Sequence, residues 1–187
     1  GSVKVLTETL ALVNPAAFGR SGRLKRYVGH MVAALGLSDA WQYEAAALLS
    51  QIGCVTLTEE TLRKIYRGLP LTPEEGLAHM EHPLIAARLL ANIPRLQRVA
   101  QMIERLSPNH VPRPPAPGAP IDEVMRGAAL LRIAVALDNA LMRGLTLHDA
   151  LREVTGLCQE WERPFLVALE TLAQQDKGME VRCLYIS

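Results

Sequence analysis

The sequence predicts an all-α protein, a bundle of about eight helices with a short strand at its C-terminal end. Apolar residues recur at spacings of three and four through most of the 187 residues, as in RLKRYVGHMVAALGL (23–37), and this spacing is typical of amphipathic helices. Strict alternation is confined to MEVRCLYIS (179–187), which indicates one strand. An apolar fraction of 49% is enough for one sizeable core.

Capping signals delimit the helices in the first third of the chain. Residues 2–13 are amphipathic and predict a connecting helix. Gly36 ends the helix that follows, because glycine readily takes the left-handed conformation found at helix C-termini. Ser38 or Asp39 begins another helix, and the aspartate and a glutamine three residues later have the spacing of a capping box. A short helix over about 59–67 comes next.

Prolines shape the middle of the chain. Thr72 and Glu75 flank a proline at the first helical position, and together they predict a capped helix start. Pro83 lies inside this helical pattern and predicts a kink or a break near His82, because proline removes a backbone donor. A further helix is expected over about 94–106.

The second half begins with a proline-rich segment. Six of the 14 residues in 107–120 (SPNHVPRPPAPGAP) are proline, which predicts an extended loop. Helical periodicity then returns in 121–144 with an apolar-rich helix of about 20 residues. A helix capped by Thr146, with Asp149 three residues on, and a last helix over 163–175 complete the prediction.

Composition argues against several functional classes. A net charge of +1 gives no global attraction to nucleic acid or to an anionic membrane, and only 4% of residues are aromatic, which disfavours base stacking. The apolar runs are shorter than the roughly 20 residues of a membrane span, and no secretory signal opens the chain. Three cysteines without a CxxC motif suggest a reducing compartment, so we expect a cytoplasmic protein.

The order of five segments carries a family resemblance. The segments are RLKRYVGHMVAALGL, YEAAALLSQIGCVTLTEETLRK, LTPEEGLAHMEHPLIAARLLANIP, VAQMIER and LLRIAVALDNALMRG. Together they resemble an HD-GYP domain of the HD superfamily over roughly residues 18–172. The resemblance implies an all-helical domain that holds two or three metal ions, often iron, and hydrolyses cyclic di-GMP. Such domains commonly follow a receiver domain in bacterial two-component systems.

The resemblance also divides the chain into three parts. Residues 18–175 would form the HD-GYP-like helical domain, and residues 176–187 a tail that contains the expected strand. Residues 1–17 would contain the connecting helix. Because Gly1-Ser2 looks like a cloning scar and the first methionine is Met31, we expect a domain cut from a longer protein.

Most positions that hold metal in the family carry other residues here. The family's LLHDIGK reads LLSQIGC, so Ser50 and Gln51 replace a histidine and an aspartate. A neutral hydroxyl and amide cannot replace an imidazole and a bridging carboxylate as ligands of iron or of hard cations. The other departures are Arg20 and Met102-Ile103 in place of histidines, Val135 in place of an aspartate, and a GYP segment of which only Pro112 is left.

His82, in the EHP motif, is the one retained ligand position, and Glu104-Arg105 are what survives of the family's double-histidine segment. One imidazole does not make a binuclear site. We therefore expect no bound metal, no cofactor and no catalytic residue, and we predict a non-catalytic signalling domain, the output part of a bacterial response regulator. The chain also resembles the HDOD group, a related family whose members keep the helical frame of HD domains without the metal ligands.

Two other functions stay open at this point. One is a module that binds cyclic di-GMP or another nucleotide without cutting it, and the other is a phosphodiesterase with a reduced metal site. The expected partners are other signalling proteins, contacted through 107–120, and a second copy of the chain, contacted through 2–13. The proline-rich segment could equally be a simple connector.

Individual residues allow alternative interpretations. Ser50 and Gln51 are either a vestigial ligand pocket or a polar pair satisfied by neighbouring groups. Arg20 is expected to point into the former metal cavity and to face Glu104, replacing the lost cations. The neighbouring basic residues are either a phosphate or partner contact or a solvated helix start: Arg23, Lys25 and Arg26.

Overall fold

The computed structural model describes residues 1–175, and this part of the chain is helical, with no strand. The strand expected within 176–187 lies outside the described residues. The all-α prediction is confirmed, with nine α-helices within residues 1–175 where about eight were expected. The elements are α1 (Ser2–Val13), α2 (Pro15–Ala34), α3 (Ala40–Leu49), η1 (Ile52–Thr56), α4 (Glu59–Arg67), α5 (Pro73–Ala91), α6 (Gln97–Glu104), α7 (Glu123–Met142), α8 (Leu147–Leu157), η2 (Glu160–Glu162) and α9 (Arg163–Gln175).

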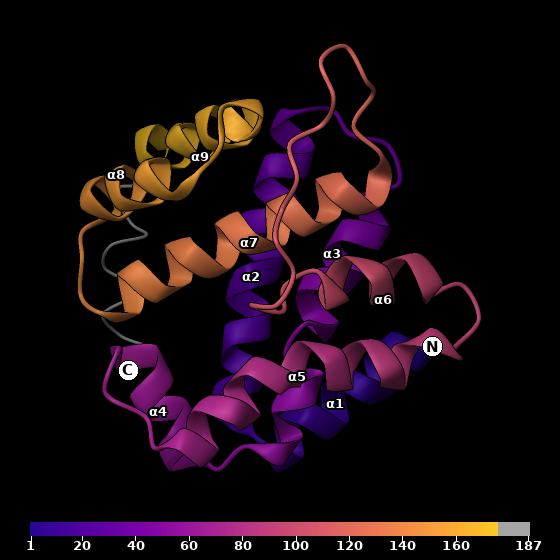
Figure 1. Ribbon diagram of the computed structural model, residues 1–187, viewed down its shortest axis with the longest axis vertical. Helices are drawn as coiled ribbons and strands as arrows, with labels where there is room; N and C mark the ends of the chain where they lie inside the picture. The colour runs from indigo at the N-terminus through magenta and orange to yellow at the C-terminus, as the bar shows by residue number, and fades with distance from the viewer. Residues whose placement is uncertain (176–187) are drawn as a thin grey trace.

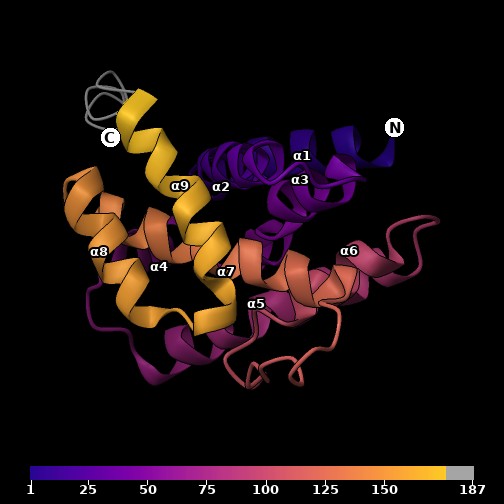
Figure 2. The same cartoon turned by 90° about the horizontal axis from the view of Figure 1, so that it is seen from above.

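Helices α2 and α7, of 20 residues each, contact each other in the middle of the bundle (Figure 1). Helices α3 and α6 contact α7 from one end, and α8 and α9 lie side by side on one flank (Figures 1 and 2). The main core joins apolar side chains of these helices, with Tyr27, Met31, Tyr43 and Leu130 among its fully buried members. A smaller cluster joins α1, η1 and α4.

Several predicted capping interactions are present. In α5 the Thr72 hydroxyl accepts from the Glu75 backbone N–H at 3.2 Å, and the Glu75 carboxylate accepts from the Thr72 N–H at 3.2 Å, which forms the expected capping box. In α8 the Thr146 hydroxyl accepts from the Asp149 backbone N–H at 3.2 Å, which caps the helix start. Gly36 follows the end of α2 with a φ of 61°, a conformation that favours glycine.

Three predictions about helix ends and breaks hold only in part. Asp39 lies at the start of α3, but its φ of 55° takes it out of the capping geometry and its side chain makes no cap hydrogen bond. Helix α5 continues through Pro83 without a break, because burial of side chains on both sides of the proline offsets the lost backbone bond. Helix α6 begins at Gln97 rather than at Pro94, since Arg95 has a φ of 70°.

Helix α1 packs against the rest of the bundle. It contacts α2, α3 and η1, and its Leu10 is buried in the smaller cluster. Its other face exposes Val5, Leu12 and Val13 to solvent. None of the helices in residues 1–175 combines the length and hydrophobicity needed to cross a membrane.

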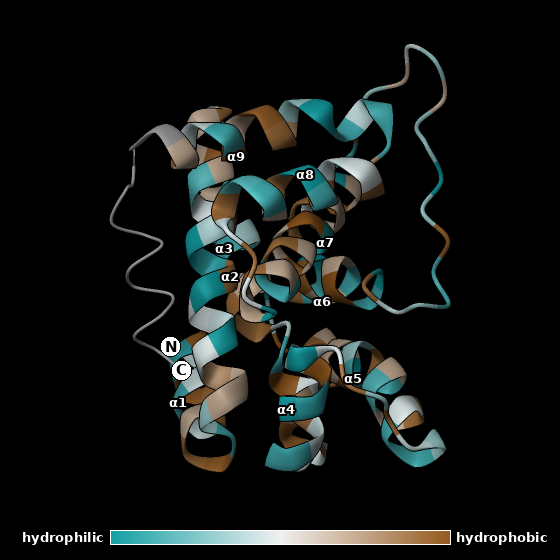
Figure 3. Ribbon diagram, turned by 90° about the vertical axis from the view of Figure 1, so that its left-hand side faces the viewer, coloured by the Kyte–Doolittle hydropathy of each residue, from teal (hydrophilic) through white to brown (hydrophobic). Residues whose placement is uncertain are grey.

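The proline-rich segment is irregular, as predicted. No helix interrupts the chain between α6 and α7, and Figure 3 shows this part as an extended trace beside the bundle. Most of its residues are exposed, including Val111. The segment is therefore accessible over most of its length.

Candidate functional site

A cavity of about 230 Å³ lies among α2, η1, α4, α5 and α7. Its aliphatic lining includes Val135 of α7, at a position where the resemblance implies a metal-binding aspartate. The polar side chains that line it are Arg20, Gln51, His79, His82, Arg132 and Asn139, together with the hydroxyl and thiol residues Tyr66 and Cys54. The cavity thus contains Arg20, Gln51, His82 and Val135 of the residues that the sequence singled out.

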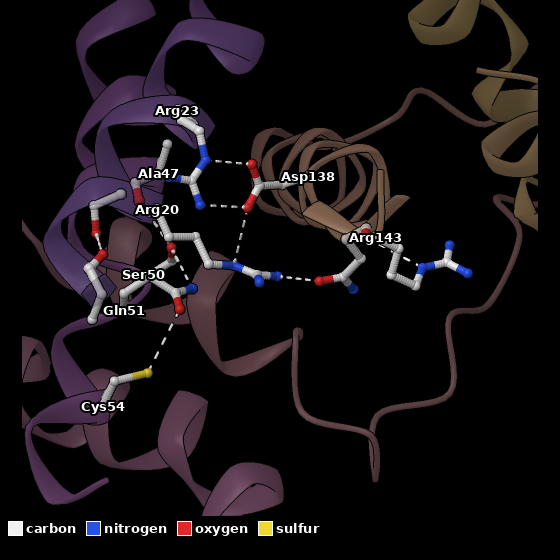
Figure 4. A network of polar contacts seen from close by, with 11 residues as sticks. Arg20, Arg23, Ala47, Ser50, Gln51, Cys54, Asp138 and Arg143 are labelled. Carbon is white, nitrogen blue, oxygen red and sulfur yellow. Dashed lines mark hydrogen bonds and ion pairs between the residues drawn. The ribbon is translucent and has the colours of Figure 1, made fainter. Parts of the chain in front are cut away.

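Ser50 and Gln51 are satisfied by local hydrogen bonds (Figure 4). The Ser50 hydroxyl donates to the carbonyl oxygen of Ala47 at 2.8 Å, and the Gln51 amide donates to the Ser50 oxygen at 3.3 Å. The Cys54 thiol donates a hydrogen bond to the Gln51 Oε1 atom over a distance of 3.6 Å. Of the two interpretations of this pair, mutual and backbone satisfaction describes Ser50 fully, while Gln51 also borders the cavity.

Two arginines of α2 point toward one carboxylate of α7, as Figure 4 shows. The Arg23 Nε and Nη2 atoms donate to the two oxygens of Asp138 at 2.7 and 3.1 Å. Arg20 Nε lies 3.8 Å from the same carboxylate, which is completely buried. Burial would lower the pKa of Arg23, but the hydrogen bond and charge of Asp138 outweigh this and raise it. Arg23 is therefore a half-buried ion-pair partner and not a freely solvated residue.

The Arg20 guanidinium extends across the cavity wall. Its Nη2 atom donates to Oδ1 of Asn139 at 2.7 Å, and its carbon lies 4.7 Å from the centre of the Tyr66 ring. Its Nε and Nη1 atoms have no hydrogen-bond partner in the described part of the chain. The prediction that Arg20 points into the cavity is supported, but its counter-charge is Asp138 and not Glu104.

Glu104 and its neighbours lie elsewhere. Glu104 is exposed and borders a separate groove between α5 and α6. Arg105 is half-buried and borders a pocket near the proline-rich segment. Met102 and Ile103 are fully buried in the main core, because the apolar face of α6 packs inward. Lys25 and Arg26 are exposed and do not line the cavity, which fits the solvated-helix interpretation for these two residues.

His79 and His82 stack on one face of α5 with ring centres 5.6 Å apart. Burial, then electrostatic interaction with His79 and with Arg20, lowers the pKa of His82 to about 3. Burial, then the charge of Arg20, also lowers the pKa of His79. Both imidazoles are therefore neutral at pH 7, and neither Nδ1 atom has a partner among the described residues.

The donors of this cavity do not fit a pair of metal ions. No carboxylate lines it, and residues 1–175 contain no group of three histidine, cysteine or acidic side chains placed to hold a metal. Burial raises the pKa of the Cys54 thiol to about 12 despite the opposing effect of Arg20, so no thiolate is present either. A fixed guanidinium charge at the wall further opposes a cation.

Sequence reasoning missed several residues of the site, Arg132 of α7 among them. Asp138 and Asn139 lie on α7, and Tyr66 lies on α4. The signal for Asp138 was a lone acid in the apolar stretch LLRIAVALDNALM, since a buried acid needs a cationic partner. No comparable signal marks Tyr66, which contacts Arg20 only through the packing of α4 on α2 and α7.

The low pKa of His82 predicts a stability that depends on pH. Because the folded state favours neutral His82, its contribution is complete above the ordinary pKa near 6.5 and is lost as the pH falls toward 3. We expect the free energy of unfolding to fall by up to about 1.4 kcal/mol per pH unit across this window. His82→Gln should remove this slope, whereas His148→Gln, which changes an exposed residue, should not. Urea unfolding at several pH values measures both, and equal slopes would contradict the assignment.

Comparison with known proteins gives one match. A family model described as HD domain matches residues 4–108, which is more than half of the chain. The match runs from α1 to the residues just after α6, so it includes the α2, η1, α4 and α5 walls of the cavity but not α7. No curated protein and no solved structure shows a significant match.

Proposed function

The chain belongs to the HD domain family, and on that premise we propose that it is a non-catalytic signalling domain of the HD-GYP type. Its role would be that of the output part of a bacterial two-component response regulator. The resemblance of the five segments supports the HD-GYP assignment over the HDOD group, because the TPEE and EHP motifs and the proline-rich segment keep their order.

The observation that carries the proposal is the charge of the cavity. A phosphodiesterase of this superfamily type needs metal ions to activate water and to neutralise the phosphate. Here the cavity wall carries Arg20, an aliphatic Val135 and a neutral Gln51, and the buried Asp138 is already engaged by two guanidinium groups. A site of this composition can hold a polar or anionic group, but no carboxylate lines it, and the His82 imidazole, with a pKa of about 3, is a weak base.

Two surfaces suit the interactions of such a domain. The segment 107–120 is extended and largely exposed, so partner proteins can bind it with a small loss of chain entropy. The exposed apolar side chains of α1 offer a second surface. We propose that signalling partners use the first surface and a second copy of the chain the second.

A second candidate function is capture of cyclic di-GMP without hydrolysis. A pocket of about 540 Å³ lies beside the proline-rich segment, with Arg105, Arg113 and Arg132 in its wall, and it shares Arg132 with the cavity. Pockets of this size hold drug-sized ligands. Guanidinium groups are suited to the two phosphates of a cyclic dinucleotide.

One experiment separates these functions. We expect protein purified without a histidine tag to contain less than about 0.2 equivalents of iron, manganese or zinc by mass spectrometry. After addition of Fe²⁺ or Mn²⁺ it should leave cyclic di-GMP intact over hours. About two equivalents of metal with turnover would contradict the non-catalytic proposal. Calorimetric heat at micromolar cyclic di-GMP, lost in Arg113→Ala but kept in Arg67→Ala, would favour the second candidate.

A further inference from the structure

The cavity contains buried donors that lack acceptors. Arg20 is 4% exposed. Its Nη1 atom has no partner among residues 1–175, and its Nε atom makes no hydrogen bond and faces Asp138 at 3.8 Å. The Tyr66 hydroxyl and the Nδ1 atoms of His79 and His82 are also buried and make no hydrogen bond within residues 1–175. Native proteins usually satisfy such buried groups with a ligand or with ordered water. The unpartnered groups come from α2, α4 and α5, so they approach one space from different sides.

The charge around this space is positive. Three guanidinium groups, those of Arg20, Arg23 and Arg132, are set against the two carboxylates of Asp138 and Glu162, which leaves one positive charge. Both carboxylates lie outside the cavity lining. Burial raises the pKa of Tyr66 and of Cys54 and lowers that of both histidines, so none of these groups supplies a negative charge. A bound anion would balance this net positive charge.

The size of the cavity limits the anion. At about 230 Å³ the cavity is smaller than the roughly 300–1,000 Å³ of pockets that hold drug-sized ligands. It therefore suits a phosphate-sized group better than a whole dinucleotide. The Nη1 atom of Arg20 has no partner among residues 1–175, and a charged guanidinium N–H donates a strong hydrogen bond to an oxygen of a tetrahedral oxyanion.

We propose that this cavity binds a phosphate-sized oxyanion without metal, either as free phosphate or as the terminal group of a phosphomonoester. Arg20 supplies the charge and the N–H donors of its Nη1 atom. Tyr66 supplies a hydroxyl, and His79 a ring N–H from the rim. The inference rests on the geometry of the cavity and not on the partner or the signalling role proposed above.

Thermal melting and calorimetry of the full chain with inorganic phosphate test the site, with chloride at equal ionic strength as the reference. We expect a saturable rise of the melting temperature in the wild type. Arg20→Met should weaken phosphate binding about 10-fold to 100-fold. Arg26→Met removes an exposed arginine from the same helix and should leave binding unchanged.

A second variant covers the case in which Arg20→Met does not fold. Tyr66→Phe keeps the ring under Arg20, loses only the hydroxyl, and should weaken phosphate binding about threefold to tenfold. An equal rise of the melting temperature in the wild type and in the site variant would overturn the proposal, because phosphate stabilises folded proteins nonspecifically.

Comparison of ligands identifies the source of the anion. Tighter binding of guanosine monophosphate than of phosphate assigns a phosphomonoester, and the reverse order assigns the free ion. Binding of Zn²⁺ or Mn²⁺ to the wild type, without binding of either phosphate, would overturn the proposal. These readouts measure affinity, so they are independent of the turnover assay that tests the non-catalytic function.

Discussion

Replacement of Gly53 by alanine is expected to lower the free energy of unfolding by about 3 kcal/mol or more, a large part of the roughly 5–15 kcal/mol of a typical domain. A Cβ atom on Gly53 would lie 2.8 Å from the carbonyl carbon of His82 and closer still to its oxygen. The obstacle is backbone, so it cannot swing aside as a side chain can. Gly53 has no positive φ, and the cost is therefore steric.

Two glycines of the same chain provide controls. Gly22 in α2 and Gly76 in α5 have open space where a Cβ would stand. Alanine at either position should stabilise the protein by about 0.5–1 kcal/mol, because alanine favours the helical conformation. Urea unfolding monitored by circular dichroism measures all three variants. A Gly53→Ala midpoint equal to that of the wild type would show that η1 and α5 are not in such close contact.

Replacement of Asp138 by asparagine is expected to cost about 3–5 kcal/mol, because it leaves the buried Arg20 and the half-buried Arg23 without a counter-charge. Asp138 is 0% exposed, and it accepts two hydrogen bonds from Arg23 and faces Arg20 at 3.8 Å. The substitution keeps the shape of the side chain, so the decrease in the free energy of unfolding measures the effect of the charge rather than of packing. An intact ion pair of this kind need not stabilise the fold, but a broken one leaves uncompensated charge.

The double variant Arg23→Met with Asp138→Asn should recover part of the loss, since it buries one uncompensated cation instead of two. Glu8→Gln removes a carboxylate whose ion pair with Lys4 is exposed, and it should change stability by less than about 0.5 kcal/mol. Denaturation at pH 7 compares the three. An Asp138→Asn effect no larger than that of Glu8→Gln would mean that α2 and α7 do not share this ion pair.

The helices were predictable because their signals are local. The Thr72 capping box and the helix-ending Gly36 depend on residues within one turn of each other, and both are present. The break predicted as one alternative at Pro83 is absent for the opposite reason. Its local cost is real, but the burial of the residues around it against other elements outweighs that cost, and the sequence does not show those contacts.

The site was predictable only in part. The position of Arg20 at the cavity followed from the resemblance, because its place in the helix order corresponds to a ligand of the family. Its partner did not follow, since Arg20 and Asp138 are 118 positions apart and meet only where α2 crosses α7. The resemblance suggested Glu104 as the residue that faces Arg20. Helix α6 turns its apolar side chains inward instead, and the Glu104 carboxylate is exposed.

The positive charge in this cavity is covalently part of the polypeptide. A guanidinium group cannot dissociate, change its oxidation state or be withdrawn by a chelator. The electrostatic character of the pocket is therefore established when the chain folds, and it does not follow the supply of iron or the redox balance around the protein. A domain with a built-in cation can respond to what binds it under conditions in which a metal-dependent relative would be empty.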